Sequence, residues 1–191
     1  MSTLALPRPA SVDRLRASDA PLWLQAAGVV GFAALTALFA QAELRVYLWE
    51  VPLTLQTVAV YGSGLFLGRT RGALAMGLYL LAGLALPIYS GGASGLEHVL
   101  GATGGYLVGF PVAAAVAGWV TETARSVSRT ALALVGASLA LFACGVTGLT
   151  LATELSLAEA AVAGWLKFVP WDLTKLALVG GLFLGARRAT R

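Results

Sequence analysis

Long stretches without charged residues alternate with short charged segments along most of this chain. The uncharged stretches are 20–42, 51–68, 72–96, 99–121 and 130–153. Each is near or above the ~18 apolar residues expected of a membrane-spanning helix. A sixth apolar stretch, 168–186, contains only two charges, Asp172 and Lys175. The pattern predicts an all-α membrane protein with six transmembrane helices. Because Pro52 lies at the start of 51–68, we expect an irregular start to the second helix.

The basic residues predict the orientation of these helices. If six helices alternate in direction, ten of the 13 Lys and Arg residues fall on one side of the membrane. The other three are Arg45, Lys167 and Lys175. Cytoplasmic loops carry the excess of Lys and Arg, so both termini are expected to be cytoplasmic. The expected location is a bacterial inner (cell) membrane, with a multi-pass topology.

The sequence divides into a tail and one domain. Residues 1–20 are polar, contain Pro7 and Pro9, and are expected to form a flexible cytoplasmic tail. Residues 21–191 are expected to form a single six-helix domain. Longer loops fall on the outer side, and in one of them Ser156 and Glu159 have the spacing of a capping box. A short helix is therefore expected over about 157–168, and a solute site is expected on the outer side.

Asp172 and Lys175 are the charges that most need an explanation. Three residues apart, they share one face of the sixth helix. Counting back from Arg187 places Asp172 about 22 Å from the inner boundary, inside the ~30 Å hydrocarbon core. Intramembrane charges mark functional sites by default. The pair is expected to bind a small polar solute beside aromatic walls, although a structural ion pair near the interface is the alternative. The wall candidates are Tyr89, Tyr106, Trp165 and Trp171.

Four segments, in the same order along the chain, resemble the BioY family. The first is Val51-Pro52-Leu53-Thr54-Leu55-Gln56-Thr57, and the second is the 67–73 turn, Leu-Gly-Arg-Thr-Arg-Gly-Ala. The third runs through 80–110 and includes Gly101-Ala102-Thr103-Gly104-Gly105-Tyr106. The fourth is Pro170-Trp171-Asp172-Leu173-Thr174-Lys175. Where this chain has Ala102 the family usually has Pro, a change that loosens the loop and removes no polar group.

The resemblance implies the six-helix fold of a biotin-specific S component of an energy-coupling-factor (ECF) transporter. Asp172 and Lys175 match the family's ligand-binding acid and lysine, and a glycine-rich loop, 87–106, would cap the ligand. The substrate-binding residues expected on this basis are Asp172, Lys175, Gln56, Tyr89, Gly104, Gly105, Tyr106 and Trp171. For Gln56, an equally favoured alternative is a hydrogen bond that holds the outer loop together. For Tyr106, the alternative is a position at the membrane interface, where tyrosine is common. An S component for another small vitamin is the runner-up.

The family also implies partners. An S component delivers its substrate to a transmembrane T component driven by two ATP-binding subunits. This chain has no Walker A motif, so ATP would be used only by those partners, and no cofactor is expected. Ala33 and Ala37 form a strip of small residues that matches the family's docking surface for the T component, or else serves packing within the chain. Membrane lipid is the remaining expected partner, and the oligomeric state stays open.

Other function classes have weaker support in the sequence. Charged residues are 12% of the chain and do not form a nucleic-acid patch. Glu97 and His98 alone do not supply enough ligands for a metal site. Gly92-Ala93-Ser94-Gly95 fits a rhomboid-like serine protease motif. However, the only histidine, His98, lies in the same loop, and a lone short motif has little specificity. The chain is therefore expected not to be an enzyme.

Overall fold

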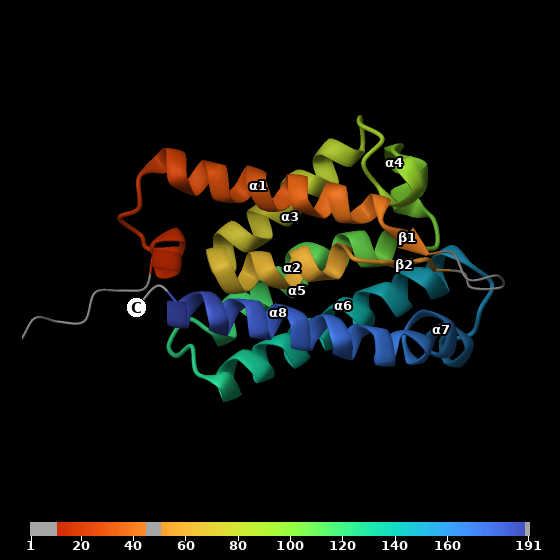
Figure 1. Ribbon diagram of the computed structural model, residues 1–191. Helices are drawn as coiled ribbons and strands as arrows, with labels where there is room; N and C mark the ends of the chain where they lie inside the picture. Colours follow the sequence, from red (N-terminus) through yellow and green to blue (C-terminus); the bar gives the residue numbers. More distant parts are fainter. Residues whose placement is uncertain (1–10, 45–50, 190–191) are drawn as a thin grey trace, which may run out of the picture.

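The structure, a computed structural model, describes residues 11–44 and 51–189 as a bundle of helices (Figure 1). The long helices are α1 (Leu22–Gln41), α2 (Gln56–Leu67), α3 (Arg69–Gly83), α5 (Gly104–Val120), α6 (Val127–Ala152) and α8 (Val169–Ala189). The shorter elements are η1 (Ser11–Arg16), β1 (Glu43–Leu44), β2 (Leu53–Thr54), η2 (Ser90–Gly92), α4 (Gly95–Leu100), α7 (Leu157–Gly164) and η3 (Leu166–Phe168). The predominantly helical class expected from the sequence is confirmed.

Three helical stretches of the described residues are long and apolar enough to cross a membrane. They are Leu22–Gln41, Val127–Ala152 and the run Leu157–Ala189. Helix α5 is apolar but has 17 residues, and α2 and α3 have 12 and 15. Large apolar side chains such as Leu38 and Leu132 are exposed on the outside of the bundle. Such a surface suits lipid rather than water, so the chain is a membrane protein.

Helix α2 is short and is enclosed by neighbouring helices. Its Val60, Tyr61 and Leu65 are fully buried. Gly64 lies against α5 so closely that a Cβ there would be 2.3 Å from the carbonyl oxygen of Ala114. The helix begins only at Gln56, since the preceding residues pair as β2 with β1. The irregular start expected after Pro52 is therefore confirmed.

The third and fourth helices are shorter than their uncharged stretches. Helix α3 ends at Gly83, although the stretch runs to residue 96. Two turn glycines in the intervening segment, Gly91 and Gly92, have φ values of 68° and 71°, which bulkier residues rarely adopt. The length of the uncharged stretch therefore overestimates the length of α3. The loop after α3 also lacks charged residues, because it consists mainly of apolar residues and glycines.

The two ends of the bundle differ in character (Figure 1). One end holds η1 and the end of α8, and the other holds the β1–β2 pair, α4 and α7. Residues 1–10 of the expected tail lie outside the described residues. From residue 11 on, the tail contacts the bundle, because Arg16 donates to the carbonyl oxygens of Leu65 and Gly118 at 3.1 and 2.9 Å.

The capping box expected near the start of α7 is present. The Glu159 amide donates to Ser156 Oγ at 3.4 Å, and the Ser156 amide donates to Glu159 Oε2 at 2.9 Å. Helix α7 starts at Leu157 as expected but ends at Gly164, and η3 continues the chain to Phe168.

Candidate functional site

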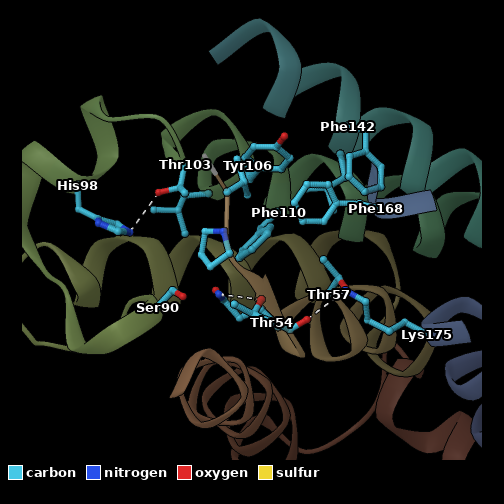
Figure 2. Close-up of a pocket in the computed structure, with 15 residues that line it drawn as sticks. Thr54, Thr57, Ser90, His98, Thr103, Tyr106, Phe110, Phe142, Phe168 and Lys175 are labelled. Atoms are coloured by element: carbon cyan, nitrogen blue, oxygen red, sulfur yellow. Dashed lines mark hydrogen bonds between the residues drawn. The ribbon is translucent and has the colours of Figure 1, made fainter. Parts of the chain in front are cut away.

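A cavity opens among the helices at the end of the bundle that carries the β1–β2 pair (Figure 2). Its empty space, which includes solvent at the open mouth, is about 590 Å³. A shallower hollow shares Pro52, Ser90, His98 and Thr103 with the cavity. The cavity therefore continues to the surface along the loop before α5.

Loop segments are linked to each other at this mouth. Ser90 Oγ donates a hydrogen bond to Glu43 Oε2, which joins the 84–103 loop to β1. Gln41 Nε2, at the end of α1, donates to the carbonyl oxygen of Tyr89 at 3.2 Å. These bonds hold the hairpin and the glycine-rich loop together beside the opening.

One side of the cavity presents polar groups from α8, β2 and the start of α2 (Figure 2). Lys175 Nζ donates to the carbonyl oxygen of Thr54 at 3.1 Å and to Thr57 Oγ1 at 2.8 Å. An ammonium has three donors, so one remains for a ligand. Gln56 is also fixed: it accepts from Tyr79 Oη at 3.0 Å and donates to Thr54 Oγ1 at 3.1 Å. The polar groups are therefore positioned before any ligand arrives.

Aromatic side chains line another side. Phe110, Phe142 and Phe168 come from α5, α6 and η3, and Tyr106 comes from the first turn of α5. Tyr106 and Phe142 meet edge to face with ring centroids 6.2 Å apart. The Tyr106 hydroxyl donates to the carbonyl oxygen of Gly164 at 2.5 Å, which ties α5 to the end of α7. The cavity thus joins an apolar aromatic surface to a cationic group.

Asp172 lies beside this cavity rather than among its lining residues. Its side chain is buried, with 3% exposed. Oδ1 accepts from Tyr61 Oη at 3.1 Å, and Oδ2 accepts from Ser138 Oγ at 2.6 Å. Buried charge is tolerated where hydrogen bonds satisfy it. Asp172 and Lys175 share one face of α8 but hold different partners, and together they connect α8 to α2, β2 and α6.

A family model decides the assignment of the chain. The model of the BioY family matches residues 13–191, which is nearly the whole sequence. The chain belongs to the BioY family.

Curated relatives and a solved structure agree with this assignment. "Biotin transporter BioY" of Rhodobacter capsulatus is 36% identical over 143 residues, 68% of this chain and 75% of that protein. "Probable biotin transporter BioY" of Pyrococcus horikoshii is 36% identical over 147 residues, 76% of this chain and 85% of that protein. A crystal structure of the S-component for biotin from an ECF-type ABC transporter matches with a TM-score of 0.77 and 20% identity. It covers 88% of this chain and 93% of that chain, so the two share a fold.

The cavity brings together only some of the residues that the BioY resemblance singled out. Gln56, Tyr106 and Lys175 line it. Tyr89, in the loop itself, is fully buried, and its hydroxyl donates to the carbonyl oxygen of Leu80 at 2.6 Å. Trp171 is 41% exposed on the outside of α8. Trp165 is half-buried and stacks on Phe142, with ring centroids 6.5 Å apart.

Gly104 and Gly105 permit close backbone packing beside the cavity. A Cβ on Gly104 would lie 1.7 Å from the carbonyl oxygen of Val99. A Cβ on Gly105 would lie 2.4 Å from the carbonyl oxygen of Cys144 and 2.7 Å from the Cα of Gly148. These glycines let α5 approach α4 and α6, and so position Tyr106, the residue that follows them.

Several lining residues were not singled out from the sequence. The aromatic ones are Phe110, Phe142 and Phe168, and the polar ones are Thr54, Thr57, Ser90 and Thr103. Thr54 and Thr57 lie inside the BioY-like Val51–Thr57 segment, which was a usable signal for them. Phe110 likewise ends the BioY-like segment 80–110. Phe142 and Phe168 lie outside the BioY-like segments and share no local spacing, so no sequence signal identified them.

The protease-like motif does not form a catalytic pair in this BioY member. His98 Nε2 lies 3.2 Å from Thr103 Oγ1, and its ring stacks on Tyr89 with centroids 5.2 Å apart. Ser94 is exposed in front of α4. His98 lines the cavity. From the sequence, a place in the pocket was the less favoured of two interpretations of this residue. The chain belongs to a transporter family and is not an enzyme.

Ala33 and Ala37 of α1 face the chain's own helices. Ala33 is 8% exposed, and Ala37 is half-buried against the same core. Both therefore contribute to packing within the chain, while the neighbouring Ala34 is exposed.

Proposed function

We propose that this chain is the S component of a biotin uptake system, capturing biotin at the outer end of the bundle. The observation that carries this proposal is membership of a family of biotin transporters, combined with a cavity lined by aromatic rings and a lysine in a matching fold. The S component binds the vitamin, and an ATP-driven ECF module completes its transport.

The chemistry of the cavity suits biotin. Biotin has a polar ureido group, an apolar ring around sulfur and a carboxylate at the end of an aliphatic chain. Phe110, Phe142 and Phe168 offer an apolar wall for the ring and chain. Lys175, with one donor left, suits a carbonyl or carboxylate oxygen of the ligand. Gln56 supplies a fixed amide next to it.

In this proposal Asp172 acts beside Lys175. Its negative charge lies one helical turn away and compensates the buried ammonium. It also holds α2 and α6 in place through Tyr61 and Ser138. The 87–106 loop closes over the ligand, with Gly104 and Gly105 fixing the position of Tyr106. Tyr89, within that loop, ties it to α3 through the carbonyl oxygen of Leu80. Trp171 anchors the outer end of α8 at the lipid interface.

The proposed topology has six spans and cytoplasmic termini. The spans are α1, α2, α3, α5, α6 and α8. The end of the bundle opposite the cavity carries Arg16, Arg69, Arg71, Arg125 and Arg187. This asymmetry supports a cytoplasmic basic end and an outward-facing cavity. The proposed location is a bacterial inner membrane.

The proposed partners are a transmembrane T component and two ATP-binding subunits. Docking of the T component on α1 stays a prediction. Ala33 is buried in the chain's own core, so a partner would meet this strip at Ala37 and at the exposed Ala34.

Uptake of labelled biotin tests this proposal. Biotin-auxotrophic cells without their own transporter would express this chain together with an ECF module from a relative. We expect accumulation above that of cells with the module alone, suppressed by excess unlabelled biotin and unaffected by thiamine. Accumulation suppressed by thiamine would reassign the chain to another vitamin. Accumulation no higher than with the module alone would contradict the proposed role.

A further inference from the structure

A second hollow lies at the basic end of the bundle, opposite the cavity. It encloses about 690 Å³ including its open mouth. Four arginines line it, and one carboxylate does so among the described residues. The residues that matter here are Arg16, Arg69, Arg71, Arg125, Thr70 and Glu122. The biotin site does not use this hollow, although the BioY-like segment 67–73 builds one side of it.

Backbone contacts hold two of these arginines in place. Arg16 donates to the carbonyl oxygens of Leu65 and Gly118. Arg71 donates to the carbonyl oxygens of Leu15 and Ala17 at 2.7 and 2.9 Å. A guanidinium has five N–H donors, so each retains donors for another acceptor. Because these groups are fixed, an anion that binds them does not have to order long, mobile side chains.

The positive charge of the hollow is only partly compensated. Arg69 meets Glu122 at 3.5 Å, with more than half of the Arg69 side chain exposed. Arg125 meets Asp13 at 3.2 Å, but its buried Nε has no hydrogen-bond partner among the described residues. Burial and the nearby Arg125 lower the pKa of Arg16 to about 10, so Arg16 is still charged near pH 7. A bound anion would relieve this repulsion.

The start of α3 adds backbone donors to the same hollow. Its first residues, Arg69, Thr70 and Arg71, are on the rim. The first turn of α3 contains no acidic residue and has no side-chain cap. Its free amide groups and the helix dipole therefore favour a negative group at this position.

The level of the hollow in the membrane points to a lipid as the source of the anion. Trp23 at the start of α1 and Trp119 near the end of α5 are 70% and 60% exposed. Tryptophan is enriched at the level of lipid headgroups. Trp119 follows Gly118, whose carbonyl oxygen accepts from Arg16 of the hollow. The hollow is therefore at headgroup depth.

We infer that this hollow binds a phosphate group, carried by the headgroup of an anionic lipid. Basic pockets between membrane helices on the cytoplasmic side suit such headgroups. Inorganic phosphate has the same recognition chemistry and is the other possible source. The inference does not depend on biotin being the substrate, because the two sites are at opposite ends of the bundle.

Native mass spectrometry of detergent-purified protein tests the inference, with phosphatidylglycerol and phosphatidylcholine added in separate arms. We expect phosphatidylglycerol to be retained more tightly than phosphatidylcholine. Arg69→Gln should weaken phosphatidylglycerol binding by about fivefold, as expected for one arginine near an anionic group. Glu122→Gln should strengthen it, because the competing carboxylate charge is lost while the shape is kept.

Arg129→Gln is the matched control, because Arg129 is exposed near the same end of the bundle but outside the hollow. It should leave the affinity within about twofold of wild type. A third arm adds inorganic phosphate alone. Binding of phosphate with the same variant dependence, without lipid preference, would support the site and assign a soluble source. Two results would overturn the inference. One is an equal loss of phosphatidylglycerol affinity in Arg69→Gln and Arg129→Gln. The other is retention of phosphatidylglycerol no tighter than that of phosphatidylcholine, together with no binding of inorganic phosphate.

Discussion

Replacing Lys175 by alanine is expected to weaken biotin binding by at least tenfold, about 1.4 kcal/mol. Lys175 is the cationic residue among the described residues that line the cavity, and one of its three donors is left for the ligand. Without the ammonium, a polar oxygen of the ligand would be buried beside aromatic rings with no strong donor. Equilibrium binding of labelled biotin to the purified variant measures the loss.

Two further variants separate ligand binding from folding. Lys175→Met keeps the length and apolar stem of the side chain, so it leaves no cavity and should lose affinity while remaining folded. Because it leaves the buried Asp172 uncompensated, its unfolding midpoint should also fall and is measured alongside. Lys167→Ala removes an exposed lysine of η3 from the same end of the bundle and should leave affinity unchanged. If Lys175→Met retained wild-type affinity, Lys175 would not be a ligand-binding residue.

Asp172→Asn is expected to lower both biotin affinity and stability. The change is nearly isosteric, but the amide cannot accept from both Tyr61 and Ser138 in the present geometry when its NH₂ replaces one oxygen. Hydrogen bonds to a charged acceptor contribute about 1.5–3 kcal/mol each. The substitution also leaves Lys175 as an uncompensated charge in the membrane. We expect affinity to fall at least about tenfold and the thermal unfolding midpoint to fall by several degrees.

Glu154→Gln provides the matched control for this substitution. Glu154 is an exposed carboxylate at the same end of the bundle, so its amide variant should match wild type in both measurements. Tyr61→Phe removes one of the hydrogen bonds to Asp172 without changing charge. It should lower stability with a smaller loss of affinity. If Asp172→Asn left both affinity and unfolding midpoint unchanged, the carboxylate would have neither a binding nor a positioning role.

The helical class and the position of the charged pair were predictable from local patterns. Charge-free stretches identify apolar helices, and the spacing of Asp172 and Lys175 places both on one helix face. The Ser156–Glu159 capping box was predictable for the same reason, since its two members are three residues apart. Each of these features depends only on residues that are close in sequence.

The partners of the pair and the walls of the cavity depend on long-range packing. Tyr61 is 111 residues from Asp172, and Thr57 is 118 residues from Lys175. No local spacing connects such residues. Gly105 is predicted at the ligand, and in the structure it also allows close contact between α5 and α6. Both ligand binding and close helix packing favour glycine, so the sequence alone does not show which of the two roles Gly105 has.

Equilibrium binding of labelled biotin to the purified wild-type protein is the most direct test of the proposed substrate. We expect saturable binding that excess unlabelled biotin displaces and excess thiamine does not. Displacement by thiamine would point to a different vitamin. No saturable binding by a well-folded sample would contradict the assignment of the cavity as a biotin site.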